Sequence, residues 1–183
     1  MKARNIPLII QTIMMYVMHL PLYIILLLIR LPIGEDALNN AVNGLLIAFL
    51  VLTVISVPIC AVTVVISSIS VFRLNYNPTK VTMIIKLVLI PWYVMNFIFC
   101  AVLIAGFLNP FLMLAIPFAI AILVSFTFLY MLTTSLPDFF YFIYRLMKKE
   151  AKTNLPTLIS VVFLFFFCLD VIGSIMLFAS QKS

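Results

Sequence analysis

Residues 41–72 read AVNGLLIAFLVLTVISVPICAVTVVISSISVF and contain no Asp, Glu, Lys or Arg. About 20 apolar residues are enough for a helix to cross the hydrocarbon core of a bilayer, and this stretch is longer. In lipid, only helices and closed barrels satisfy the backbone, and barrel strands alternate polar and apolar residues. Because this run is continuous, it predicts a transmembrane helix that tilts or projects into the cytoplasm.

The rest of the chain has the same character. Of the 183 residues, 66% are hydrophobic and 9% are charged, whereas a soluble domain has about 25% charged residues. The predicted fold class is therefore all-α: a polytopic integral membrane protein with a bundle of five transmembrane helices and one amphipathic interfacial helix, forming a single domain over residues 1–183. The expected spans are about 6–30, 41–72, 80–108, 111–134 and 156–179, and the interfacial helix covers about 136–152.

Several of the predicted helices begin with the same kind of signal. An Asn lies one or two residues before a Pro at Asn5, Asn77, Asn109 and Asn154. Asn caps free backbone amides, and Pro suits the first helical turn because its missing N–H would have no partner there. The first apolar stretch is longer than the core of a signal peptide, so we expect it to be retained as a span.

The basic residues predict the orientation, because Lys and Arg concentrate on the cytoplasmic side of membrane proteins. With the N-terminus in the cytoplasm, nine basic residues lie inside and two, Arg30 and Lys182, lie outside. After five spans the C-terminus then emerges outside. The nine expected inside are Lys2, Arg4, Arg73, Lys80, Lys86, Arg145, Lys148, Lys149 and Lys152.

One cytoplasmic segment resembles a surface helix. Ser135 and Asp138 form an S-x-x-D capping signal, and apolar and basic residues separate onto opposite faces of the helix that follows. Such a helix lies in the inner headgroup layer, where anionic lipid attracts basic side chains. Docking of a cytoplasmic partner is the alternative. The basic residues are Arg145, Lys148, Lys149 and Lys152.

Polar groups within the spans are the candidates for function, because they are costly in lipid. Asp170 would cost about 2.5–3.5 kcal/mol at a helix centre. His19 is its predicted partner, since the two residues lie at similar distances from the starts of their spans. This pair would serve as a structural clasp or as a proton- or ligand-linked site. Asn96 falls near the same level and is expected to form a hydrogen bond between helices.

Small polar residues form a stripe on one face of residues 41–72, at helical spacing. Such a face allows helices to approach closely, so it predicts a packing surface, with the wall of a solute path as the alternative. The stripe consists of Ser56, Cys60, Thr63, Ser67 and Ser70.

Signals for catalysis and for cofactors are missing from the sequence. It contains no H-E-x-x-H, G-x-S-x-G or glycine-rich phosphate loop, and its isolated cysteines and single histidine predict no metal site. The basic residues are explained by topology, so no nucleic-acid partner is expected. We therefore expect no cofactor, and an intramembrane enzyme is the third-ranked interpretation.

Two functions remain after these exclusions. The first is a non-enzymatic membrane protein that acts through contacts with other membrane proteins, as an accessory subunit or as an immunity or regulatory protein. Its expected partners are the lipid bilayer and either a membrane protein or further copies of this chain. The second is a small oligomeric carrier or channel that uses His19 and Asp170. The composition suits a bacterial inner membrane.

Overall fold

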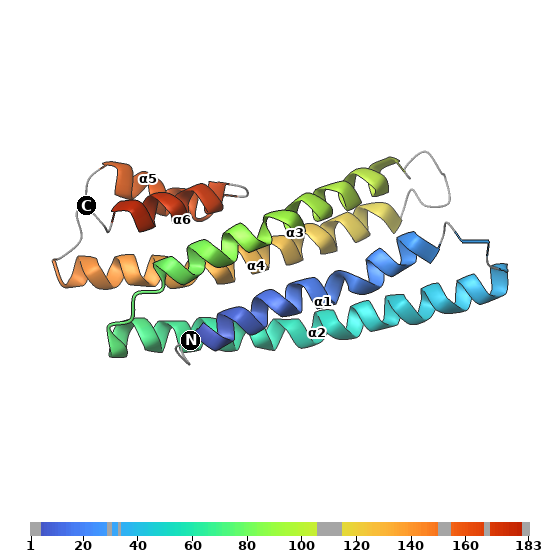
Figure 1. Ribbon diagram of the computed structural model, residues 1–183, viewed down its shortest axis with the longest axis horizontal. Coiled ribbons are helices and arrows are strands. Elements are labelled where there is room, and N and C mark those ends of the chain that lie inside the picture. The colour runs from blue at the N-terminus through green and yellow to red at the C-terminus, as the bar shows by residue number, and fades with distance from the viewer. Residues whose placement is uncertain are drawn as a thin grey trace. The chain divides into compact units, whose positions relative to one another are not determined.

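The computed structural model describes residues 5–180 except 29, 30, 33, 106–114, 150–154, 167 and 168. In these residues the regular structure is entirely helical (Figure 1). The helices are α1 (Ile6–Leu28), α2 (Glu35–Leu74), α3 (Thr79–Ala105), α4 (Ala115–Met147), α5 (Leu155–Phe163) and α6 (Leu169–Ser180).

The four helices α1 to α4 are long and apolar enough to cross a membrane. Their exposed surface is rich in large apolar side chains, such as Val54 at 71% and Phe97 at 72% exposure, while many buried side chains are polar. A soluble protein rarely exposes extended apolar surface. This inside-out distribution agrees with the predicted all-α membrane protein.

The chain divides into two compact units, Met1–Thr63 and Val64–Ser183, called unit 1 and unit 2 below. In unit 1, α1 lies antiparallel to the first part of α2. The Thr63 hydroxyl lies 3.4 Å from the Pro7 carbonyl oxygen, and the His19 ring packs edge-on to the Phe49 ring, with centroids 6.1 Å apart. The start of α1 therefore lies beside a late part of α2 in unit 1, and the end of α1 lies beside an earlier part.

Unit 2 is organised around the antiparallel pair α3 and α4. The Asn96 side chain donates to Thr127, and Thr82, nearer the start of α3, bonds to Asp138, nearer the end of α4. α6 packs against both helices, and α5 packs against α6.

The start of α3 agrees with the predicted Asn signal. The Asn77 side-chain oxygen accepts from the backbone amide of Thr79 at 3.1 Å and from its hydroxyl at 2.7 Å. Asn75, directly after the end of α2, has a φ of 51°, a left-handed conformation that Asn tolerates after a helix end.

The boundary expected between the fourth span and the interfacial helix does not exist. α4 runs without interruption from Ala115 through Pro137 to Met147, so it joins the predicted span 111–134 to most of the predicted helix 136–152. Ser135 and Asp138 do not cap a helix start there. Their side chains bond instead to α3 and α6, and these contacts explain why the capping interpretation was wrong.

The predicted fifth span, 156–179, is not a single helix. α5 ends at Phe163, where backbone amides at Leu164 and Phe165 bond three residues back, to Val161 and Val162. The chain then reverses, and α6 returns beside α5, so the start of α5 and the end of α6 lie at the same end of unit 2 (Figure 1). At about 1.5 Å per residue, neither helix reaches the roughly 30 Å thickness of a bilayer core.

The two short helices pack closely because residue 173 is glycine. A Cβ atom at Gly173 would lie 2.7 Å from the Ser160 carbonyl oxygen and 3.0 Å from the Phe163 Cβ. A small apolar core joins α5, α6 and the turn after α5 to α4: Phe142, Val161, Leu164 and Leu177, with Phe139 and Phe165 against it. The hairpin is thus held by its own packing and by contacts with α3 and α4.

Candidate functional site

Three charged side chains lie within unit 2, each on a different helix. Lys86 comes from α3, Asp138 from α4 and Asp170 from the first turn of α6. All three are fully buried, with 0% of each residue exposed. Burial of a charge is costly unless it is paired and hydrogen-bonded, so the partners of these three groups decide what the cluster is.

Lys86 connects α3 to the other two helices. Its ammonium nitrogen Nζ donates to the Ser135 hydroxyl at 2.7 Å and to the backbone carbonyl of Asp170 at 3.2 Å. The same nitrogen lies 3.6 Å from the Asp170 carboxylate oxygen Oδ2. The lysine therefore has an acidic partner and two neutral acceptors.

Asp170 has a second partner on α3. The Tyr93 hydroxyl lies 3.4 Å from the same carboxylate oxygen, Oδ2. The carboxylate also occupies the first turn of α6, where the helix dipole favours a negative charge. Together with Lys86, these contacts suit an ionised Asp170.

Asp138 has a different environment. Its Oδ1 accepts from the Thr82 hydroxyl at 2.6 Å, and its Oδ2 accepts from the Ser174 hydroxyl at 3.1 Å. Both partners are neutral, one on α3 and the other on α6. Among the described residues, the one buried ion pair within 4 Å joins Lys86 to Asp170 and not to Asp138.

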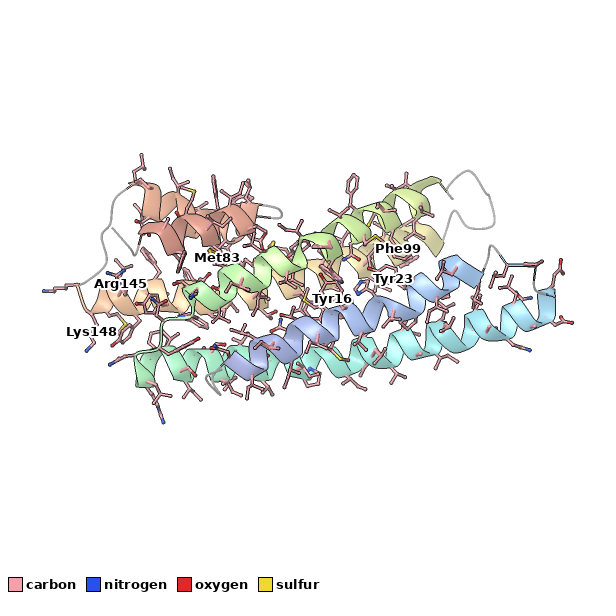
Figure 2. All side chains as sticks on the ribbon, viewed as in Figure 1. Tyr16, Tyr23, Met83, Phe99, Arg145 and Lys148 are labelled. Carbon is pink, nitrogen blue, oxygen red and sulfur yellow. The ribbon has the colours of Figure 1, made fainter. Side chains whose placement is uncertain are left out.

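These six polar contacts place a charge cluster at the closed end of the hairpin. We define the charge cluster as Lys86, Asp138 and Asp170 with their hydroxyl partners Thr82, Tyr93, Ser135 and Ser174. Basic residues mark the end of the unit at which α3 begins and α4 ends. Figure 2 labels Arg145 and Lys148 there, and Lys148 is exposed. Lys86 lies seven residues further along α3 than Thr79, which is about 10 Å of helix.

Asp170 was identified from the sequence, but its partners were not. The structure pairs it with Lys86 and Tyr93 in unit 2, while His19 belongs to unit 1 and places its Nδ1 3.0 Å from the Met15 carbonyl oxygen. The pairing of His19 with Asp170 stays a prediction.

Lys86 and Asp138 were missed as site residues. The positive-inside pattern groups Lys86 with the cytoplasmic lysines, and the S-x-x-D pattern predicts a capping role for Asp138. A usable signal was present: Lys86 is flanked by MII and LVLIPW, and a lysine inside an apolar helix needs an acidic partner.

The third intramembrane candidate, Asn96, has a partner outside the charge cluster and lies three residues beyond Tyr93 on α3. Its amide donates to the Thr127 hydroxyl at 3.1 Å across α3 and α4. Both residues line a half-open apolar groove of about 340 Å³ together with Phe97, Cys100, Val124 and Phe128. Residues of both α3 and α4 form this groove.

The remaining candidates are positioned as follows. All five residues of the α2 stripe are buried: Ser56, Cys60, Thr63, Ser67 and Ser70. Of the predicted headgroup residues, Lys148 and Lys149 are exposed and Arg145 is half-buried, whereas Lys152 lies outside the described residues.

The part of the chain that the structure describes contains no group of three or more His, Cys, Asp or Glu residues that could hold a metal ion. The carboxyl, ammonium and hydroxyl groups of the charge cluster can form ion pairs and hydrogen bonds and can exchange protons.

Comparison with known proteins supplies a family. No curated protein and no solved structure matches the chain. A family model described as a family of unknown function, DUF6652, matches residues 9–183 and so covers both units. The chain belongs to the family of unknown function DUF6652.

Proposed function

We propose that the protein is a small multi-pass membrane carrier or channel whose solute or ion site is the charge cluster. The observation that supports this is the burial of Lys86, Asp138 and Asp170 between three helices at the closed end of a hairpin. Ionisable groups inside a membrane are expensive and mark ion or substrate pathways. The function is non-enzymatic in this proposal.

The hairpin of α5 and α6 suits a solute site within the membrane. We propose that it enters the membrane from the cytoplasmic side and returns to it without crossing. Non-helical backbone is tolerated at membrane depth where it is buried in protein or lines a cavity, and transporters bind solutes at such discontinuous helices. Asp170, on the first turn after the reversal, holds the hairpin to Lys86.

With this hairpin, the proposed topology differs from the five-span topology predicted from the sequence. Four helices cross, the hairpin does not, and both termini lie in the cytoplasm. Nine basic residues are then cytoplasmic, Arg30 is outside and Lys86 is within the membrane, which accounts for all eleven and agrees with the positive-inside tendency. The composition supports a bacterial inner membrane as the location.

The decisive experiment tests whether water reaches the charge cluster. In a variant without the native cysteines, Ser135→Cys is exposed in vesicles to a charged thiol reagent that does not cross the membrane. A carrier or channel opens the cluster to one side, so we expect labelling. Val124→Cys on the same helix, 54% exposed on the apolar surface, is the matched control and should stay unlabelled.

The outcomes are distinct. Labelling of Ser135→Cys, followed by its loss on addition of a transported solute, supports the proposal. No labelling from either side, with the variant still folded by thermal unfolding, describes a dry bundle and rejects a solute path. Ser174→Cys repeats the test from α6 in case Ser135→Cys does not fold.

A second candidate function rests on the groove of α3 and α4. An apolar groove with Asn96 and Thr127 at its wall suits a transmembrane helix of another membrane protein or of a second copy, because polar side chains and close packing drive helix association in lipid. Phe97→Cys and Phe128→Cys crosslinking in native membranes tests this. A crosslinked product at both positions, absent for Ile55→Cys, would support an accessory, immunity or regulatory role.

A further inference from the structure

The charge cluster has more acid than base. If Lys86, Asp138 and Asp170 were all ionised, the cluster would hold one positive and two negative charges. A single net charge enclosed in apolar surroundings is strongly unfavourable. Among the described residues, the titratable groups whose contacts or charge interactions define the cluster are these three and Tyr93, from α3, α4 and α6, and α5 has no titratable residue.

We infer that Asp138 holds one exchangeable proton, which makes the proposed carrier or channel proton-coupled. This inference rests on the proposed function for the coupling but on the charge cluster alone for the proton. With one proton bound, the ammonium of Lys86 is balanced by the carboxylate of Asp170, and the cluster is neutral.

The contacts place the proton on Asp138 and not on Asp170. Asp170 has the ammonium of Lys86 at 3.6 Å and the helix start to stabilise its charge. Asp138 has two neutral hydroxyls instead. The Lys86 ammonium also attracts a negative charge on Asp138, but it forms its ion pair within 4 Å with Asp170. A carboxyl group whose direct hydrogen-bond partners are neutral loses less when it is protonated than one that is paired with an ammonium group.

The hydrogen bonds of Thr82 fit both states of Asp138. Its hydroxyl lies 2.6 Å from Asp138 Oδ1, 3.1 Å from the Thr79 carbonyl oxygen and 3.3 Å from the Pro78 carbonyl oxygen. One hydroxyl has one hydrogen to donate. When Asp138 is ionised, Thr82 donates to it. When Asp138 is protonated, it donates to Thr82, which turns its own hydrogen toward a backbone carbonyl.

The bound group is a proton and not a metal cation for a geometric reason. The Thr82 and Ser174 oxygens are already at direct hydrogen-bond distance from Asp138, and a metal ion would require several oxygen ligands arranged around a central space. A solute with one positive charge that enters the cluster displaces the proton, because the cluster then remains neutral.

Infrared spectroscopy of the full chain in lipid vesicles counts the protonated carboxyl groups. The chain has five acidic residues, so a background with Glu35→Gln, Asp36→Asn and Glu150→Gln leaves only Asp138 and Asp170 to contribute. At pH 7 we expect one carboxylic acid per chain in this background, none after Asp138→Asn, and two after Lys86→Met. Absence of the acid band in the background, or its persistence after Asp138→Asn, would overturn the inference.

Two conservative variants locate the proton and keep the test valid if Asp138→Asn does not fold. Thr82→Val removes a partner of Asp138 and should shift the carbonyl band, whereas Tyr93→Phe removes a partner of Asp170 and should leave the band in place. The reverse result would assign the proton to Asp170 and contradict the inference. A protonated Asp138 in a cluster that no thiol reagent reaches would support this inference while rejecting the proposed function, so the two failures are distinguishable.

Discussion

The two units differ in where several of their polar side chains find hydrogen-bond partners. In unit 1 the hydroxyls of Thr12 and Ser56 donate to carbonyls of their own helices, those of Leu8 and Thr53. In unit 2 the side chains of Lys86, Asp138 and Asp170 bond across α3, α4 and α6. A polar group that is satisfied within its helix places little constraint on the fold, whereas a charge that depends on another helix fixes how the helices pack.

The largest expected effect separates the charge cluster from surface charge. Lys86→Met leaves two buried carboxyl groups without a base, and loss of one partner of a buried pair costs about 3–5 kcal/mol. Thermal unfolding in mild detergent should show a large decrease in midpoint. Lys80→Met, an exposed lysine on the same helix, is the control and should have little effect.

A double variant sharpens this result. Lys86→Met combined with Asp170→Asn removes both members of the ion pair and should recover part of the lost stability. If the midpoint of Lys86→Met equals that of Lys80→Met, the buried pair makes no contribution and the distinction between the units fails.

The next effect concerns backbone packing in the hairpin. Gly173→Val places side-chain atoms against the Ser160 carbonyl, where even a Cβ has only 2.7 Å, and overpacking costs about 1–3 kcal/mol. In unit 1, a Cβ atom added at Gly44 would have no neighbouring atom within 4 Å. Gly44→Ala should therefore stabilise α2 by about 0.5–1 kcal/mol, because Ala favours a helix more than Gly does. Gly173→Val should lower the unfolding midpoint and Gly44→Ala should raise it. An increase for both variants would show that the hairpin is not closely packed.

A pair of isosteric substitutions compares the hydroxyls directly. Thr82→Val removes a bond to Asp138 on another helix and should cost about 1 kcal/mol. Thr12→Val removes a bond to Leu8 in its own helix and should change the free energy of unfolding by less than about 0.5 kcal/mol. Denaturant or thermal unfolding of both variants in one detergent provides the measurement, and a larger loss for Thr12→Val would reverse the comparison.

A smaller effect than that of Thr82→Val is expected at the groove. Asn96→Leu with Thr127→Val removes one neutral interhelix bond, and such bonds in membrane proteins are worth about 0.6 kcal/mol on average. A double-mutant cycle on the unfolding free energy isolates this coupling. A coupling as large as that between Lys86 and Asp170 would place the groove beside the charge cluster as a second polar centre.

A cycle with His19→Ala and Asp170→Ala tests the pairing predicted from the sequence. Additive effects on stability would exclude that pairing. A coupling energy between His19 and Asp170 larger than that between Lys86 and Asp170 would instead support a direct pairing of these two side chains.

The predictability of the site differs from residue to residue. Asp170 was recognisable because an acid in an apolar run of Leu, Val, Ile and Phe is costly wherever it lies. Lys86 was not, because a lysine near a helix start can extend its amine to the membrane surface. Its partners Ser135 and Asp170 lie 49 and 84 residues away in the chain, so no local pattern links them to it.

Composition and hydropathy alone predicted an apolar, helical protein with five spans, and four helices, α1 to α4, are long and apolar enough to cross a membrane. Helical periodicity and hydropathy are local properties, which is why they can be read along the chain. Long-range contacts were needed to show that α4 continues through Pro137, that α5 and α6 form a hairpin, and that three charges meet. Residues 162–170 contain neither Pro nor Gly, so the reversal depends on long-range contacts at Gly173 and Lys86, whose energies no local sequence window contains.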